Sequence, residues 1–260
     1  MTLKIDLTCE AKYYSIDFER TGFLSIYTQI GTLVEHGNRS QSMRLHNNVL
    51  GGAVLEVTNL SFGYSLGRQI LVNVNLSCQG GDVVHIKGSN GRGKSTFIKI
   101  LAGLIRPQAG TLSWTDNQKV MMPFETCEYL AAEQNGLNDE LTAMDNLRFW
   151  PSLKGVQVTE PMVLKVLERW GLSGKLVQSN LTIARFSTGM KRRLALARVC
   201  LSNSRIWLLD EPTYGLDTQG LSALKDMIQD HKDKGGLTLV VSHEPGELSK
   251  LFTNTVELAG

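Results

Sequence analysis

Residues 88–95, GSNGRGKS, restrict the possible folds of this chain more than any other segment. They match the pattern G-x-x-x-x-G-K-[ST] in full. The segment follows VVHIK, a short apolar run typical of a buried strand, and precedes the helix-like TFIKILAGLI, which ends before Pro107. A strand, this loop and a helix form the context that a phosphate-binding loop requires. The sequence therefore predicts a loop that wraps around phosphate groups at the N-terminus of a helix.

The residue types in this loop suit that chemistry. Glycines let consecutive backbone N–H groups turn toward phosphate oxygens, and the following helix adds its dipole. Lys94 supplies a positive charge to the β and γ phosphates, and the Ser95 hydroxyl is a ligand for Mg²⁺. The expected nucleotide contacts in this segment are Gly88, Ser89, Asn90, Gly91, Arg92, Gly93, Lys94, Ser95 and Thr96.

Two acidic residues follow the apolar run IWLL. Asp210 comes directly after it, so its side chain is expected at the carboxyl edge of a buried strand, where parallel-sheet proteins hold their ligands. A carboxylate there can bind Mg²⁺, and the adjacent Glu211 can orient or deprotonate an attacking water. The alternative interpretation is a plain solvated loop, which the upstream phosphate-binding loop disfavours.

The remaining patterns predict strands that alternate with helices. LEVTNLSFGY and ILVNVNLSC alternate like strands and should form an antiparallel pair ahead of the phosphate-binding loop. One helix is expected from a capping box at Thr142 through Phe149, and another from Thr159 to Trp170. The order as a whole indicates an α/β fold with a parallel sheet, an antiparallel flap before it and a helical insertion within it.

Two later helices are predicted from their apolar spacing. MKRRLALARVCL should be helical, and the helix before the strand LTLVVSH should have its own apolar face. The residues expected on these two faces are Leu194, Ala197 and Leu201 in the first helix, and Leu221, Leu224 and Ile228 in the second.

Composition excludes several classes of protein. Of the 260 residues, 42% are hydrophobic and 20% are charged, which is typical of a globular chain with a sizeable core. The net charge of +2 and the lack of a long basic tract give no reason to expect a nucleic-acid partner. Apolar runs such as residues 206–209 are far shorter than the roughly 18 residues that would span a bilayer.

Residues 1–50 match no predicted domain. They have neither the continuous apolar core of a signal peptide nor the acid-poor composition of a transit peptide. Met43 lies shortly before the first regular strand pattern, so translation starting there is an alternative. The segment is therefore interpreted as an unassigned N-terminal extension.

The motifs together resemble those of the ATP-binding-cassette (ABC) ATPases. A phosphate-binding loop, a short Ser-Gly element in FSTGM and an apolar strand ending in DEP follow one another in that family's order. The resemblance implies a P-loop NTPase with a RecA-like parallel sheet core, an antiparallel β subdomain and a helical subdomain at about 134–190. It covers most of the chain and implies an ABC ATPase domain over residues 53–260, with ATP and Mg²⁺ as cofactors.

FSTGM occupies the place of the family's LSGGQ-type signature. Ser187 and Gly189 match its serine and second glycine, whereas residues 186, 188 and 190 depart from the pattern. In the family this element offers a hydroxyl and an unobstructed N–H to the γ-phosphate bound by the opposite subunit. An ordinary loop at the start of a helix is the alternative interpretation.

The resemblance implies roles for four further residues. Tyr64 lies where an aromatic ring stacks on adenine, and Gln134 lies where the Q-loop glutamine touches Mg²⁺ and couples to a membrane subunit. Asp217 fits the loop that crosses the dimer, and His243 fits the switch histidine that contacts the γ-phosphate. Surface positions or satisfied hydrogen bonds are the expectation for the other histidines, at positions 36, 46, 85 and 231.

A narrower resemblance concerns residues 129–150, YLAAEQNGLNDELTAMDNLRFW. This stretch is similar to the Q-loop region of the cytochrome c maturation ATPases, the CcmA-type haem exporter subunits. The similarity implies a homodimer of ATPase subunits, bound to integral membrane transporter subunits on the cytoplasmic face of the inner membrane. The alternatives are the ATPase of another ABC exporter, a regulatory module that binds ATP with little turnover, and a soluble ATPase of translation or DNA repair.

Overall fold

The computed structural model describes the backbone of residues 17–18 and 24–25, together with residues 53–64, 68–117, 119–174 and 181–258. Two units can be distinguished, Met1–Asn47 and Asn48–Gly260. Within the first unit, β1 (Asp17–Phe18) pairs antiparallel with β2 (Leu24–Ser25). The other residues of the segment 1–50 lie outside the described residues. The interpretation of this segment as an extension, with Met43 as a possible start, therefore stays a prediction.

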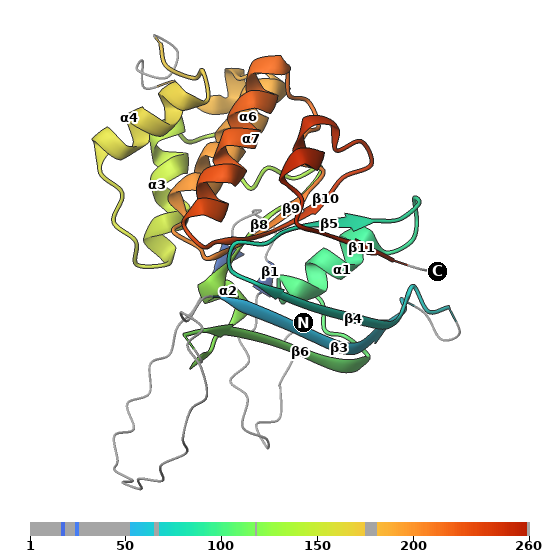
Figure 1. Cartoon of the computed structure of the whole chain (residues 1–260). Helices are drawn as coiled ribbons and strands as arrows, with labels where there is room; N and C mark the ends of the chain where they lie inside the picture. Colours follow the sequence, from blue (N-terminus) through green and yellow to red (C-terminus); the bar gives the residue numbers. More distant parts are fainter. Residues whose placement is uncertain are drawn as a thin grey trace, which may run out of the picture. The chain divides into compact units, whose positions relative to one another are not determined.

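The second unit contains two sheets and a set of helices (Figure 1). The predicted antiparallel pair is confirmed as β3 (Val54–Phe62) and β4 (Leu71–Gln79), and the predicted strand VVHIK as β5 (Val83–Lys87). The other strands are β6 (Ala109–Asp116), β7 (Lys119–Val120), β8 (Cys127–Leu130), β9 (Ile206–Asp210), β10 (Leu237–Val241) and β11 (Asn254–Glu257).

The helices occupy both sides of the parallel sheet, as an α/β fold requires. They are α1 (Lys94–Leu101), α2 (Pro123–Thr126), α3 (Ala143–Leu153), α4 (Glu160–Arg169), α6 (Thr188–Leu201) and α7 (Thr218–Asp233), with the 3₁₀ turns η1 (Ile183–Arg185) and η2 (Gly246–Leu251). No helix in the part of the chain that the structure describes combines the length and apolarity needed to cross a bilayer.

The parallel sheet has five strands in the order β11-β5-β10-β9-β8. Every pair of neighbouring strands in this sheet is parallel. Val241 of β10 pairs with Ile86 of β5 on one side and with Asp210 of β9 on the other. The central strands β9 and β10 are buried along their whole length, which explains their continuous apolar runs. The carboxyl ends of β5, β9 and β10 therefore reach the same edge side by side.

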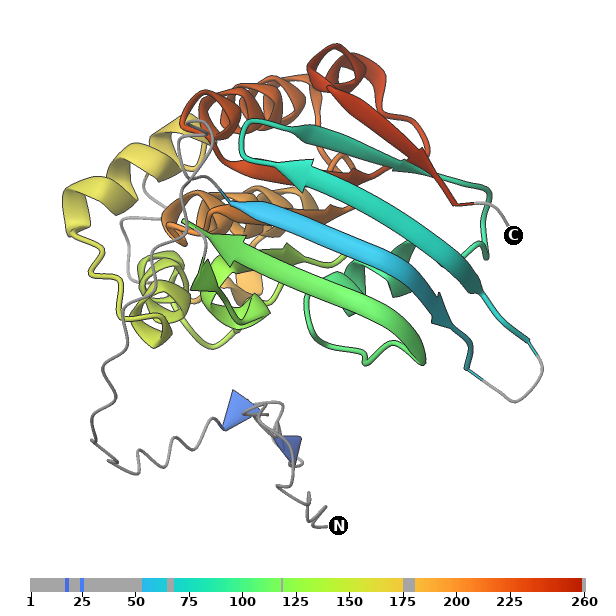
Figure 2. The same ribbon diagram turned by 60° about the horizontal axis from the view of Figure 1, so that its bottom comes forward.

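The antiparallel sheet covers α1. Its strand order is β4-β3-β6-β7, and Figure 2, in which this sheet comes forward, shows β3 between β4 and β6. The apolar side chains of α1 pack into one core with residues of β3, β4 and the parallel sheet. A second core lies on the other face of the parallel sheet, where α3, α4, α6 and α7 pack (Figure 1).

A buried charge cluster joins the helical region to the parallel sheet. Glu128 of β8 accepts from Arg198 of α6 at 2.8 Å and from Lys154, which follows α3, at 2.9 Å. Lys154 also donates to the Cys127 carbonyl at 2.7 Å. Buried charges require such partners, because an unpaired one is strongly destabilising.

Three details differ from the sequence predictions. The helix after the phosphate-binding loop ends at Leu101, because Gly103 adopts a left-handed φ of 74° that reverses the chain. The helix that begins after Thr142 continues past Phe149 to Leu153, with Pro151 tolerated in its last turn. Leu221 is 38% exposed, because the buried face of α7 centres on residues 220, 223–224, 227–228 and 231.

The N-cap bond predicted at Thr142 is confirmed and gives a test of local stability. The Thr142 hydroxyl accepts from the Asp145 N–H at 3.1 Å and donates to the Asp145 carboxylate at 2.7 Å. Thr142→Ala should lower the free energy of unfolding by about 1 kcal/mol, measured by urea denaturation. The matched control is Thr159→Ala, since Thr159 precedes α4 without a side-chain capping bond. Equal losses in both variants would contradict this assignment.

Candidate functional site

The phosphate-binding loop has the backbone that its glycines permit. Gly91 and Gly93 have φ values of 80° and 83°, in the left-handed region. A Cβ at Gly93 would lie 2.4 Å from a methyl carbon of Ile70, so a side chain is excluded there for space as well as conformation. The loop leads directly into α1, whose first residue is Lys94.

Lys94 closes the loop on itself. Its Nζ donates to the Gly88 carbonyl at 2.7 Å and to the Ser89 carbonyl at 3.1 Å. Arg92 is exposed, and its Nε donates to the Ser89 hydroxyl at 3.2 Å. Lys94 thus holds a positive charge at the N-terminus of a helix, where anions are stabilised.

A cavity of about 410 Å³ opens beside this loop at the carboxyl edge of the parallel sheet. It brings together ten of the predicted site residues, from four separate segments of the chain. They are Tyr64, Asn90, Gly91, Gly93, Lys94, Ser95, Thr96, Asp210, Glu211 and His243. A volume of this size is typical of a small-molecule site.

Asp210 is almost fully buried at the end of β9. Burial raises the pKa of its carboxyl, while a hydrogen bond from Ser95 and the nearby cations Lys99, Arg192 and Lys94 oppose this rise. Its Oδ1 is buried and has no hydrogen-bond partner among the described residues. An unpartnered buried carboxylate oxygen beside a serine hydroxyl is a donor set that suits a hard divalent cation.

Glu211 is held in an uncommon conformation. Its φ is 46°, in the left-handed region that non-glycine residues rarely occupy. Its N–H donates to the Val241 carbonyl at 2.9 Å, and its carboxylate accepts from the His243 N–H at 3.1 Å. The His243 Nε2 lies 3.7 Å from the same carboxylate. These contacts turn the Glu211 carboxylate toward His243 at the mouth of the cavity.

Tyr64 presents an exposed aromatic ring on the rim. The residue is 64% exposed, and its hydroxyl is hydrogen-bonded to the Thr96 hydroxyl at 3.1 Å. Its ring packs edge-on against Phe62, with centroids 5.0 Å apart. The exposed ring can stack on a flat heterocycle next to the phosphate-binding loop.

The FSTGM element forms the N-terminus of α6. Ser187 is the N-cap residue, and its hydroxyl accepts from the Met190 N–H at 3.2 Å. A Cβ at Gly189 would lie 3.2 Å from the Gly215 carbonyl, which makes the position tight for a side chain. A signature element and an ordinary loop would both lie at the start of a helix, so this position does not distinguish them. Neither Ser187 nor Gly189 lines the cavity of its own chain.

Gln134 and Asp217 also lie outside this cavity. Gln134 is exposed in the segment after β8. Asp217 accepts from the Gly220 N–H at 2.8 Å at the start of α7 and forms an ion pair with Arg193. The Gly220 N–H and then Arg193 lower the pKa of the Asp217 carboxyl.

Arg192 is the residue that the sequence analysis missed. It is buried on α6, and its guanidinium donates to the backbone carbonyls of Asp210 and Glu211 at 3.2 and 2.7 Å. The signal was present in the sequence, because residue 192 lies three, four and seven positions before Ala195, Leu196 and Val199. An arginine on the apolar face of a helix indicates a buried polar contact.

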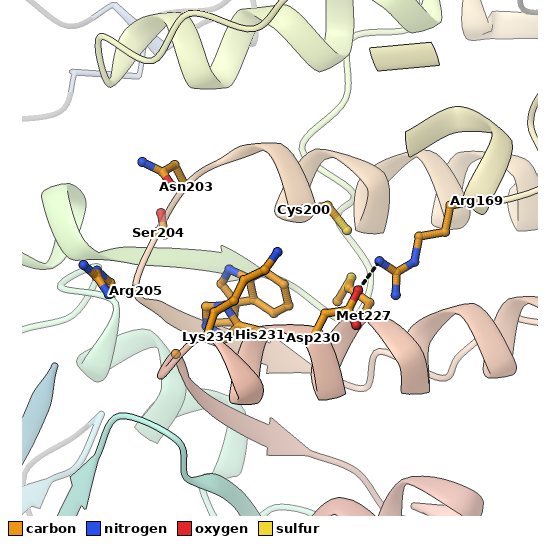
Figure 3. A pocket seen from close by; sticks show the side chains of 11 residues that line it. Arg169, Cys200, Asn203, Ser204, Arg205, Met227, Asp230, His231 and Lys234 are labelled. Carbon is orange, nitrogen blue, oxygen red and sulfur yellow. Dashed lines mark hydrogen bonds and ion pairs between the residues drawn. The ribbon is translucent and has the colours of Figure 1, made fainter. Parts of the chain in front are cut away.

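A second cavity, of about 200 Å³, lies at the opposite, amino edge of the sheet (Figure 3). None of the predicted site residues lines it. His231 is buried there, its ring stacked on Trp207 at 3.6 Å, and burial lowers the pKa of His231 to about 4. Its Nε2 has no hydrogen-bond partner among the described residues, so this histidine is neither on the surface nor fully satisfied. His85 fits the prediction, with a hydrogen bond to the Ser242 carbonyl at 2.9 Å, whereas positions 36 and 46 lie outside the described residues.

Comparison with known proteins agrees with this geometry. The family described as "ABC transporter" matches residues 71–214. The chain is 38% identical over 187 residues to the cytochrome c biogenesis ATP-binding export protein CcmA of Bordetella bronchiseptica, covering 71% of this chain and 82% of that protein. It is 33% identical over 194 residues to the CcmA protein of Vibrio cholerae, covering 74% and 91%.

Solved structures share the fold. An ATP-binding subunit of an ABC transporter aligns with a TM-score of 0.68 and 28% identity, over 79% of this chain and 85% of the other. A dimeric ATP-binding cassette in a post-hydrolysis state, bound to ADP and Pi, aligns with a TM-score of 0.67 and 23% identity, over 78% and 94%.

The position of Lys94 gives a direct test of the phosphate-binding loop. Lys94→Ala should weaken binding of MgATP by about 10- to 100-fold, because the charged donor to the phosphate oxygens is lost. Titration with a fluorescent ATP analogue measures this affinity. The control is Lys87→Ala, which removes an exposed lysine at the end of β5. An unchanged affinity of Lys94→Ala for MgATP would contradict the assignment of this segment as a phosphate-binding loop.

Proposed function

This chain belongs to the ABC transporter family, and we propose that it is the ATP-hydrolysing subunit of a transporter that handles haem in cytochrome c biogenesis. One observation carries the enzymatic part of this proposal. A single cavity is lined by Lys94 and Ser95 from the phosphate-binding loop, by Asp210 and Glu211 after β9, and by His243 after β10. These side chains provide a phosphate clamp, a metal ligand, a general base and a γ-phosphate contact.

Mg²⁺ fits the donors at this site. Ser95 and Asp210 would hold the ion, because the Oδ1 of Asp210 is buried without a partner among the described residues. Gln134 would join them in the nucleotide-bound state. The bound ion would neutralise phosphate charge as the terminal phosphate leaves.

The chain's own residues account for the other steps. Lys94 exchanges the carbonyls of its own loop for phosphate oxygens when ATP binds. Glu211 orients a water and accepts its proton, and His243 contacts the γ-phosphate. The exposed ring of Tyr64 stacks on adenine.

A second copy of the chain completes each site. The N-terminus of α6, with the Ser187 hydroxyl and the Gly189 N–H, would face the γ-phosphate held by the other copy. Asp217 would lie at the crossing between the two copies. This arrangement explains why Ser187 is exposed and why neither Ser187 nor Gly189 lines the cavity of its own chain.

The narrower role rests on the named relatives and on residues 129–150. Those relatives are cytochrome c biogenesis ATP-binding export proteins, and identity of 38% extends over most of both chains. We place the subunit against membrane partners on the cytoplasmic face of the inner membrane, where ATP is supplied. The exposed Gln134 segment is the proposed site of coupling to those partners.

Removing the general base separates binding from hydrolysis. Glu211→Gln should bind ATP normally, hydrolyse it at least about 100-fold more slowly and accumulate as an ATP-bound dimer, because it cannot accept the proton of the attacking water. Phosphate release and size-exclusion chromatography measure the two effects. Glu247→Gln, an exposed ion-pair residue on η2, is the control. Hydrolysis at the parental rate by Glu211→Gln would exclude Glu211 as the base.

The cellular role is tested by haem staining. A strain that carries Glu211→Gln at the native locus should lose covalent haem from its c-type cytochromes, because the transporter can no longer turn over. A strain with Glu247→Gln should retain it. Normal c-type cytochromes in the first strain would contradict the role in cytochrome c biogenesis and would favour the ATPase of an ABC exporter with another cargo.

A further inference from the structure

Arg192 connects three segments of the catalytic domain through one buried side chain. It is 2% exposed on α6. One terminal nitrogen donates to the carbonyls of Asp210 and Glu211, at 3.2 and 2.7 Å. The other donates to the Ala131 carbonyl at 2.8 Å and to Asn135 Oδ1 at 3.2 Å. The fork therefore joins α6 to the end of β9 and to the segment that carries Gln134.

The acceptors of Arg192 are neutral groups, which distinguishes it from a structural ion pair. Burial lowers its pKa to about 10, and the charges of Asp210 and Glu211 only partly oppose this. Arg198, on the same helix, instead has a direct carboxylate partner in Glu128 at 2.8 Å. Burying a cation without a paired carboxylate is unfavourable, so stability alone does not explain Arg192.

The contact with Glu211 explains what this unfavourable burial achieves. Glu211 has a left-handed φ of 46°, which an unsupported non-glycine residue rarely adopts. Val241 fixes the N–H of Glu211 on one side of its Cα, and Arg192 fixes its carbonyl on the other. With both peptide groups fixed, the direction of the Cα–Cβ bond of Glu211 is determined, and the His243 N–H holds the carboxylate itself at 3.1 Å. The next residue is Pro212, which has no N–H and can donate no backbone bond of its own.

We propose that Arg192 is a positioning residue for ATP hydrolysis, which fixes the backbone of Glu211 against the segment that carries Gln134. The inference rests on the proposed function in one respect, that Glu211 is the general base. Because the same guanidinium holds Asn135, next to Gln134, displacement of that segment also displaces the support of Glu211. The residue acts on the rate of hydrolysis rather than on ATP binding.

The first test separates kcat from KM in the full-length protein. Arg192→Gln should lower kcat by about 10-fold or more while KM and the Kd for MgATP change less than about twofold. Arg192→Lys should lie between it and the parental chain, because one ammonium cannot reproduce the bidentate fork. Parental kcat in both variants would overturn the inference, as would loss of ATP affinity in step with kcat.

The second test asks whether Arg192 acts through Glu211. In the Glu211→Gln background, adding Arg192→Lys should slow hydrolysis no further, because the group being positioned is already absent. A further loss equal to that in the parental background would contradict the proposal.

A buried arginine on the same helix controls for folding. Arg198→Gln should lower the thermal midpoint at least as much as Arg192→Lys while retaining more of the parental kcat. An equal fall of kcat in variants of equal stability would make the role of Arg192 merely structural and overturn the inference. An inactive parental chain would overturn the proposed function itself, whereas an active parental chain with unaffected Arg192 variants would overturn this inference alone.

Discussion

The register of three parallel strands is the constraint on which the site depends. Val241 of β10 pairs with Ile86 of β5 on one side and with Asp210 of β9 on the other. The loops that follow these strands therefore start next to one another, although about 150 residues separate the first from the last. Parallel strands deliver their carboxyl ends to one edge, and this edge collects the phosphate-binding loop, the carboxylates of Asp210 and Glu211, and His243.

Packing on both faces of the parallel sheet maintains this register. One core joins α1 to the antiparallel sheet, and the other joins α3, α4, α6 and α7 to the opposite face. Hydrogen bonds and ion pairs also fix the orientation of the helices against the sheet, because apolar packing is not directional. Glu128 ties the helical region to β8 through Arg198 and Lys154, while Arg192 ties α6 to the backbone of Glu211, the proposed general base. The helix that presents the FSTGM element is thus linked to the backbone of Glu211 in its own chain.

Much of this arrangement was predictable from the sequence, because it follows from local patterns. The phosphate-binding loop has a fixed residue spacing, and Asp210 follows a continuous apolar run that is typical of a buried strand. Other features depend on tertiary contacts. The early end of α1 is set by the conformation of Gly103, and the exposure of Leu221 by how α7 lies on the sheet. The position of Arg192 on the apolar face of a helix was visible in the sequence, but its acceptors come from segments that only the folded chain brings together.

In the proposed dimer, a second copy of the chain completes each site. Mixing a Lys94→Ala chain with a Gly189→Asp chain tests it most directly, because each variant lacks a different part of the site. Phosphate release would be measured for each variant alone and for the mixture. Both variants should be inactive alone, and the mixture should regain hydrolysis, since mixed dimers contain one intact site. A mixture as inactive as its components, or a Gly189→Asp chain that hydrolyses ATP at the parental rate, would contradict it.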